Sequence, residues 1–339
     1  MHSFYGFQYE TDPHNIIDYL KIGTKIPIWK EFEKFIFFDL RHFNTKSIIS
    51  YRKKSNGQKE ILGHVLTFIV EKVLYFGFFG IINDVYEEQE RLISKLIEYA
   101  QENKCEKIKG PINIPTVIYG WGFMAEGSET SLFVSKPVNS PDYINSFLKL
   151  GFKIIAIEHT WEGYFEYYYY KYLKFLNLSD KYEIEFHNWE EIRKLKWVYL
   201  DLNARNLPET SILTPHTDIL FDSYLDFIKR YGYPSMVLFA RFKENNKYVG
   251  CITCLPNPFP RKNKDKIDSL VLYSLVVDPE HRKKGLGWFL NKIMVEKAIE
   301  KDFSFISTPI EKSVKTTQKM AEKGGLKLTR KHNILEYSI

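Results

Sequence analysis

The chain has 339 residues and a net charge of +6, and 44% of its residues are hydrophobic and 27% charged. This length exceeds one ordinary hydrophobic core, so we expect two domains with ample apolar residues for packed interiors. The mild positive charge favours anionic partners but does not by itself indicate nucleic acid. No apolar run approaches the roughly 20 residues of a membrane span, and residues 1–5 do not open a secretory signal, so we expect a cytoplasmic protein.

The chain has three cysteines, Cys105, Cys251 and Cys254, and this odd number argues against a disulfide framework. Cys251 and Cys254 form a C-x-x-C pattern inside a β-type run, where positions three apart point to opposite faces. No second cysteine pair and no H-x-x-x-H pattern completes a tetrahedral zinc site. We therefore expect buried thiols and no metal.

The pattern of the amino-terminal half predicts several strands, then a helix, then one short strand. The strands are expected at residues 35–40, 47–51, 62–70 and 73–82, the helix at 87–101 and the short strand at 107–109.

Tyrosines and lysines crowd the middle of the chain. Tyr164–Phe175 contains six tyrosines, and such aromatic residues among lysines can stack on nucleic-acid bases. The basic content is low, however, so a junction between domains is the better interpretation. We therefore expect one domain at residues 1–165, a linker at 166–179 and a second domain at 180–339.

The carboxyl-terminal half has a cleaner pattern, with Asn188 as the cap of its first helix. Strands are expected at residues 182–186, 236–242, 248–255, 270–277 and 303–307, and helices at 189–203, 218–230, 285–301 and 313–323. Residues 326–329 and 333–337 are expected to form a closing hairpin. The resulting order is β-α-α-β-β-β-α-β-α-β-β.

A basic loop with two glycines joins the strand at 270–277 to the helix that begins at Gly285. The loop runs Arg282-Lys283-Lys284-Gly285-Leu286-Gly287. Glycines let the backbone approach an anion, and the first N–H groups of a helix point toward it. The positive side chains reinforce those amides. The sequence therefore predicts a phosphate site at this loop.

Residues 277–287 fit the pattern V-x-P-x-x-R-x-x-G-x-G, which resembles the acyl-CoA-binding motif of the GNAT superfamily of N-acetyltransferases. The order of elements over residues 180–339 is also that of the superfamily. The resemblance implies an α/β fold with a mixed sheet, and acetyl-CoA or another acyl-CoA as co-substrate. It implies that the strand holds the pantetheine arm, the loop the pyrophosphate, and the last helix one hydrogen bond. The implied residues are Leu275, Val276 and Val277 on the strand, Arg282, Lys283, Lys284, Gly285, Leu286, Gly287 and Trp288 on the loop, and Ser313 on the helix.

The catalytic acid of the superfamily has no match in this chain. That acid is often a tyrosine in the last helix, where this chain has Met320, which cannot give a proton. Tyr273 is the one titratable side chain of the motif strand and is our candidate acid or base. Glu209, His216 and Asp218 could also reach the cleft, although solvated or capping roles are expected for them. We expect direct transfer to an amine, because no cysteine has a neighbouring histidine or helix N-terminus to lower its thiol pKa.

The amino-terminal half resembles a degenerate copy of the same fold, so we expect two tandem GNAT folds. Tyr143–Phe152 resembles the Y-x-x-x-G-F helix end of the superfamily. The loop at residues 80–87 has no arginine and no paired glycines, and Asp84 and Glu87 would repel a pyrophosphate. The chain is also similar to an uncharacterised family of tandem-domain prokaryotic acetyltransferase-like proteins, which implies no particular substrate.

Two other functions stay open. One is a non-catalytic acyl-CoA sensor, and the other is a tandem-fold aminoacyl transferase that resembles the peptidoglycan-bridge enzymes and uses aminoacyl-tRNA. The intact phosphate loop argues against the second. The expected partner is a small-molecule or peptide amine. No membrane and no nucleic acid are expected, and assembly as a homodimer is left open.

Overall fold

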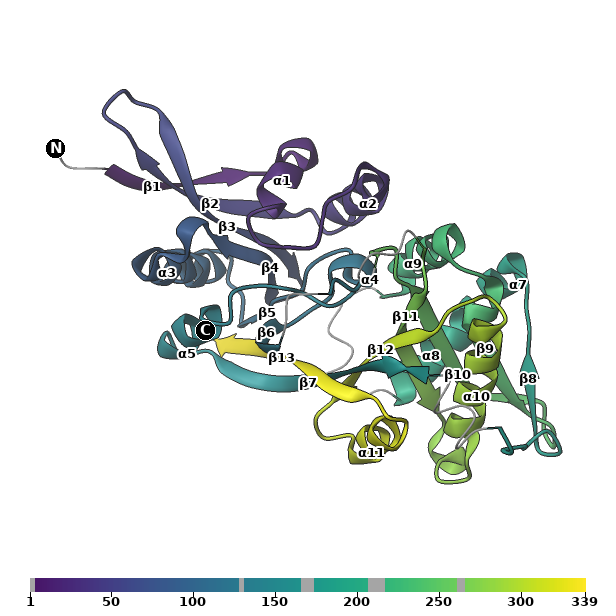
Figure 1. Cartoon of the computed structure of the whole chain (residues 1–339). Helices are drawn as coiled ribbons and strands as arrows, with labels where there is room; N and C mark the ends of the chain where they lie inside the picture. Colours follow the sequence, from purple (N-terminus) through teal and green to yellow (C-terminus); the bar gives the residue numbers. More distant parts are fainter. Residues whose placement is uncertain (1–3, 128–130, 166–173, 207–216, 261–265) are drawn as a thin grey trace. The chain divides into compact units, whose positions relative to one another are not determined.

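The computed structural model describes residues 4–127, 131–165, 174–206, 217–260 and 266–339 (Figure 1). The chain divides into two compact units, and each takes residues from both halves of the sequence. Unit 1 comprises Met1–Glu129, Ser135–Glu158 and Arg330–Ile339, and unit 2 comprises Thr130–Val134 and His159–Thr329. Whether residues 1–165 and 180–339 fold independently stays a prediction, and most of the expected linker, residues 166–173, lies outside the described residues.

Unit 1 is built on a mixed sheet with the strand order β1-β2-β3-β4-β5-β13, in which β6 also pairs with β13. Neighbouring strands are antiparallel except for β4 and β5, which are parallel. The strands are β1 (Phe4–Glu10), β2 (Lys46–Lys53), β3 (Lys59–Val70), β4 (Val73–Ile81), β5 (Lys107–Gly110), β6 (Phe123–Gly127) and the end of β13 (Lys327–Ser338). The helices are α1 (Pro13–Leu20), α2 (Glu33–His42), α3 (Tyr86–Glu102), α4 (Thr116–Tyr119) and α5 (Tyr143–Lys149).

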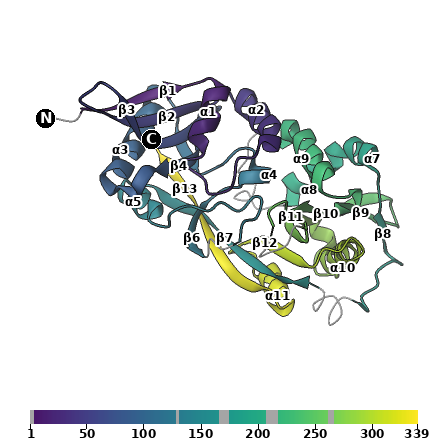
Figure 2. The same ribbon diagram turned by 45° about the horizontal axis from the view of Figure 1, so that its top comes forward.

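An aromatic core holds unit 1 together. Phe76 and Phe79 of β4 meet Phe123 of β6 and Phe147 of α5, and all four side chains are almost fully buried. The rings of Phe76 and Phe147 stack with centroids 5.0 Å apart. Such ring pairs stabilise a core beyond the apolar area that they bury. Helices α3 and α5 lie side by side over this core in both ribbon views (Figures 1 and 2).

Unit 2 contains a run of mixed strands in the order β7-β12-β11-β10-β9-β8. Strands β8 to β11 pair antiparallel in turn, and β11 pairs parallel with β12. The strands are the end of β7 (Lys153–Tyr164), β8 (Tyr182–Glu185), β9 (Val237–Phe242), β10 (Lys247–Pro256), β11 (Ser269–Val277) and β12 (Phe305–Glu311). The helices are α7 (Trp189–Lys194), α8 (Lys196–Asn206), α9 (Thr217–Tyr231), α10 (Leu286–Ile299) and α11 (Lys315–Lys323). Figure 2 shows α8 and α9 on one side of β10 and β11, and α10 on the other.

The expected mixed α/β architecture is confirmed, and most predicted elements lie within a few residues of their expected places. Asn188 caps α7 as predicted, because its side chain accepts from the backbone N–H of Glu191 while the Glu191 carboxylate accepts from the backbone N–H of Asn188. The helix predicted at residues 189–203 is in fact two helices, because the chain leaves regular helical geometry at Leu195. The strand expected at 303–307 begins later, at Phe305, and the last helix begins at Lys315.

The strand predicted at residues 35–40 is wrong, because this segment is helix α2. Its buried residues are Phe35, Ile36, Asp39 and Leu40, and this spacing of one, three and one places them on a single helical face. Aromatic and β-branched residues favour strands on average, yet burial of one helical face outweighs that preference here.

The closing hairpin predicted at residues 326–337 is also wrong. The segment is the single strand β13, whose pairing shifts register between Lys331 and His332 without reversing the chain. No glycine, proline or asparagine lies between residues 326 and 332 to form a tight turn. Instead, Leu335 pairs with Gly110 of β5, so the end of the chain completes the sheet of unit 1.

Candidate functional site

In unit 2 the two parallel strands β11 and β12 separate partway along their length. They pair from Ser269 with Phe305 to Val271 with Ser307, and no further pair follows in the described part of the chain. On its other edge β11 stays paired with β10 as far as Val277. The backbone of Leu275–Val277 thus presents one edge that no described strand occupies. An extended ligand can pair with such an edge as an added strand does.

Tyr273 occupies an irregular position where the two strands separate. Ser274 pairs with Thr253 and Leu272 with Cys254, so Tyr273 is an extra residue in the strand, a β-bulge. Its ring lies edge-on to the ring of Tyr224 in α9, with centroids 6.0 Å apart. Tyr273 therefore faces the helices on the α8–α9 side. Bulges commonly re-aim a side chain beside an active site.

Side chains from α7, α8, α9 and the sheet enclose a narrow cavity beside this bulge. It is small, about 20 Å³, which is room for little more than one water molecule, and Tyr199, Tyr224, Thr253 and Tyr273 contribute to its lining. Burial raises the pKa of the Tyr199 hydroxyl well above its ordinary value, so this phenol stays protonated near neutral pH. A protonated hydroxyl can donate a hydrogen bond but cannot act as a base.

The loop after β11 bends so that the amino terminus of α10 is left open. Lys283 and Gly285 have positive φ angles of 59° and 88°, and Gly285 is the residue that precedes the helix. No side chain caps α10, and its first turn contains no acidic residue. The first backbone N–H groups of a helix have no acceptor within the helix, so this start of α10 can bind an anion. Lys283 and Lys284 are exposed beside them, whereas Leu286 is buried.

The two glycines of the loop differ in the space beside them. A β-carbon at Gly285 would lie 3.3 Å from Leu178 Cδ1, and one at Gly287 would meet only Val277 Cγ2, at 3.8 Å. Gly287 thus faces open space rather than the protein interior. Trp288 follows it in the first turn of α10 and is half-buried. Strand, loop and helix start therefore bring the residues predicted on β11 and at the loop into one continuous site.

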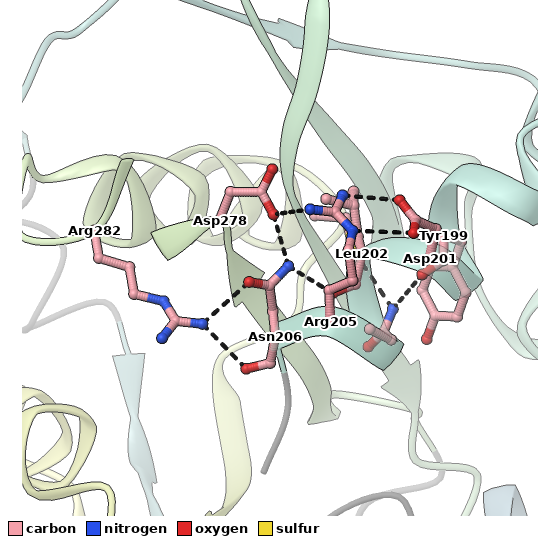
Figure 3. A network of polar contacts seen from close by, with 9 residues as sticks. Tyr199, Asp201, Leu202, Arg205, Asn206, Asp278 and Arg282 are labelled. Carbon is pink, nitrogen blue, oxygen red and sulfur yellow. Dashed lines mark hydrogen bonds and ion pairs between the residues drawn. The ribbon is translucent and has the colours of Figure 1, made fainter. Parts of the chain in front are cut away.

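Arg282 differs from the neighbouring lysines, because its guanidinium is engaged by the protein. Its Nε donates to the carbonyl of Val277 at 2.8 Å, and its Nη2 donates to the backbone and side-chain oxygens of Asn206. Asn206 in turn donates to Asp278 (Figure 3). This network was not foreseen, although asparagines at the end of a helix before a proline break were visible in the sequence.

The other predicted residues lie further from this arrangement or outside the description. Ser313 is exposed in the turn before α11, where its hydroxyl donates to the Glu311 carboxylate. Glu209 and His216 lie outside the described residues, and Asp218 lies at the start of α9.

The cysteines do not form a reactive centre. All three are free and buried, and burial raises the pKa of the Cys251 and Cys254 thiols to about 12. The thiolate is the nucleophilic form, and its population at neutral pH is therefore negligible at these two positions. Among the described residues no cluster of three or more histidine, cysteine or acidic side chains could hold a metal ion. None of the described helices combines the length and the apolar character needed to cross a membrane.

In unit 1 the corresponding strands β4 and β5 also separate after three pairs, from Val73 with Lys107 to Tyr75 with Lys109. Here, however, the gap is filled by the chain itself. Ile112 N–H donates to the Phe76 carbonyl at 2.7 Å, and the Asn113 side chain accepts from Phe78 N–H at 2.6 Å. The backbone groups of β4 that could pair with a pantetheine arm are therefore used internally.

The start of α3 in unit 1 is likewise unsuited to phosphate. Its first turn contains Glu87 and Glu88, whose charges favour the positive end of the helix and oppose an anion there. The backbone N–H of Ile81, just before the turn, donates to the Tyr143 hydroxyl. These contacts give a physical basis for the expected loss of CoA binding in this half.

Comparison with known proteins places these features in context. Residues 189–325 match the acetyltransferase (GNAT) family, and this range contains β11, the loop and α10. A search of curated proteins finds no match to the chain.

Solved structures match over almost the whole chain. One is the glucosamine N-acetyltransferase region of a fungal multi-domain β-N-acetylglucosaminidase, with 14% identity and a TM-score of 0.62 over 99% of this chain and 38% of the fungal one. A tandem GNAT protein from the clavulanic acid biosynthesis pathway matches with 11% identity and a TM-score of 0.59, over 99% of this chain and 98% of its own. An N-acetyltransferase from Sphaerobacter thermophilus matches with 9% identity and a TM-score of 0.56, over 98% and 95% of the two chains. At these identities the likeness shows the fold alone, which confirms a tandem GNAT architecture.

Proposed function

The chain belongs to the GNAT superfamily of acetyltransferases, whose family pattern its residues 189–325 match, and from this premise we propose that it transfers an acyl group from acyl-CoA to an amine. The observation that supports this most is the combined geometry of unit 2. A strand with one open edge leads into a basic loop and an uncapped helix start. These are the features that an extended arm and a pyrophosphate require.

The residues present fit acyl-CoA, which would supply the activated acyl group. The open edge of Leu275–Val277, apart from the Val277 carbonyl that accepts from Arg282, would hold the pantetheine arm. The first N–H groups of α10 would hold the pyrophosphate. Lys283 and Lys284 would add positive charge beside it, and the bare backbone at Gly285 and Gly287 would allow close approach. We expect acetyl-CoA as the first choice among acyl-CoA co-substrates.

Proton transfer is the part of the reaction for which this chain offers the fewest groups. We propose that Tyr273, at the bulge on the α8–α9 side, donates or accepts a proton and that water relays the rest. Transfer is direct, because the high thiol pKa of Cys251 and Cys254 argues against an acyl-enzyme. Ser313, already bonded to Glu311, would contribute at most one hydrogen bond to the co-substrate.

The acceptor is proposed to be a small-molecule or peptide amine, and cytoplasmic location stays a prediction. We would incubate the full chain with acetyl-CoA and a panel of amines, and follow release of the CoA thiol with a thiol reagent. All three cysteines of the protein are buried, so their background reaction should be small. The panel should include lysine peptides, polyamines and glucosamine, the last because the fungal structure contains a glucosamine N-acetyltransferase region.

The assay also separates the alternatives. Acyl-CoA binding without transfer to any amine would favour a sensor. Binding of tRNA in place of acyl-CoA would favour aminoacyl transfer. Failure to bind any acyl-CoA would contradict the proposal as a whole.

A further inference from the structure

Helix α8 presents an unusual polar face to the co-substrate strand. Tyr199, Asn203 and Asn206 lie four and three residues apart, so they share one face of the helix. Asn203 accepts from the Ser274 hydroxyl of β11 at 2.5 Å, and its amide donates to Cys251 Sγ of β10 at 3.7 Å. A helix that only covers a sheet would place apolar side chains here. The polar face follows β11 from its bulge to its end.

The last of these residues, Asn206, binds two side chains of the loop that precedes α10. Its side-chain N–H donates to Asp278 Oδ1 at 2.8 Å, and its side-chain oxygen accepts from Arg282 Nη2 at 3.1 Å. Figure 3 shows Asn206 between these two side chains. Arg205 also donates to Asp278, at 2.9 Å, while it pairs with Asp201 one turn earlier. The end of α8 is thus fastened to the loop at its first and fifth residues.

Arg282 completes this connection with its fork of donors. Its Nε binds the Val277 carbonyl, and its Nη2 binds both the backbone carbonyl and the side chain of Asn206. A cation at the carboxyl end of a helix is favourable, because the last carbonyls of the helix lack backbone partners. Three of the donor contacts of the guanidinium are therefore made within the protein, whereas Lys283 and Lys284 extend into solvent.

We propose that Asn206 is a positioning residue for the phosphate loop, and that Arg282 acts through Asn206 rather than as a phosphate ligand. This inference rests on the proposed acyl-CoA function. The loop carries two residues with positive φ, Lys283 and Gly285, and such a backbone must be held in shape before the anion arrives. The bonds of Asn206 connect this loop, which would hold the co-substrate, to helix α8.

A double-mutant cycle on CoA affinity tests this coupling, with isothermal calorimetry on the full chain and free CoA as the probe. Asn206→Ala and Arg282→Gln should each weaken binding by roughly tenfold, the effect of one lost hydrogen bond. The double variant should bind no more weakly than either single variant, because both remove the same connection. Additive losses would overturn the inference.

Two further variants test whether Arg282 acts by positioning the loop or by its charge on the phosphate. Arg282→Lys keeps the charge but loses the planar fork, so it should bind CoA as weakly as Arg282→Gln. Near-parent affinity in Arg282→Lys would show that charge alone matters and would contradict the proposal. The control Lys283→Gln/Lys284→Gln should flatten the salt dependence of affinity, whereas Asn206→Ala should shift affinity without changing that dependence.

These outcomes are distinguishable from failure of the proposed function. A parent chain that binds no CoA contradicts the function, and this inference with it. A parent chain that binds CoA while the cycle shows additive losses overturns the inference alone. If Asn206→Ala does not fold, as judged by circular dichroism, the comparison of Arg282→Lys with Arg282→Gln still decides the question.

Discussion

Two replacements of Gly287 should show whether the co-substrate needs the space beside this residue, independently of any effect on the stability of helix α10. Gly287 lies in the first turn of α10, and a β-carbon there meets only Val277 Cγ2 at 3.8 Å, an ordinary contact. Gly287→Ala should therefore fold at least as well as the parent, with up to about 1 kcal/mol of added stability from lower chain entropy in the unfolded state. Gly287→Trp should also fold, because its indole extends into open space.

The two variants should differ in CoA binding. The indole would fill the space that the pyrophosphate needs and would remove at least two charge-assisted hydrogen bonds to the first N–H groups of α10. At about 1.5–3 kcal/mol each, their loss weakens CoA binding by roughly 10²- to 10⁴-fold. Gly287→Ala adds one methyl group and should bind much more tightly than Gly287→Trp. Calorimetry that shows parent affinity in a folded Gly287→Trp protein would refute the placement of the phosphate site.

Three further predictions concern stoichiometry, proton transfer and acid stability. Titration of the full chain should give one CoA per chain, since Asn113 and its neighbour fill the gap in unit 1; two equivalent sites would contradict this. Tyr273→Phe should lower the rate of acyl transfer by roughly 10²-fold without weakening CoA binding, and a parent rate would eliminate Tyr273 as acid or base. Burial lowers the pKa of His64 and His332 from an ordinary 6.5 to about 3, so their contribution to stability is fully present above pH 6.5 and is lost as pH falls toward 3. The free energy of unfolding, measured with urea, should fall by up to about 1.4 kcal/mol per pH unit for each histidine in this window. His64→Gln should reduce this slope by the contribution of one proton, about 1.4 kcal/mol per pH unit. An unchanged slope would show that the pKa of His64 is not lowered by burial.

The sequence predicted the elements whose signals are local. The strand, basic loop and helix around Gly285 were recognisable because glycine, charge and apolar periodicity all agree over a dozen residues. The Asn188 cap was recognisable for the same reason. The fold class followed from the order of such elements.

Features that depend on distant contacts could not be predicted in this way. The segment at residues 35–40 has the composition of a strand, and only its neighbours in the fold make it helix α2. The path of β13 depends on Gly110, far away in the sequence. The Asn113 side chain fills the gap between β4 and β5 because it accepts from a backbone N–H 35 residues away. No local sequence pattern predicts such a contact.

Amide hydrogen exchange on the full chain, with and without acetyl-CoA, tests the central claim most directly. The account predicts that acetyl-CoA slows exchange at residues 275–277 and 283–288, where the open strand edge and the start of α10 would bind it. Residues 76–88, at the corresponding place in unit 1, should exchange at the same rate in both conditions. Protection at residues 76–88, or its absence at 283–288 under saturating acetyl-CoA, would contradict the assignment of the site to unit 2.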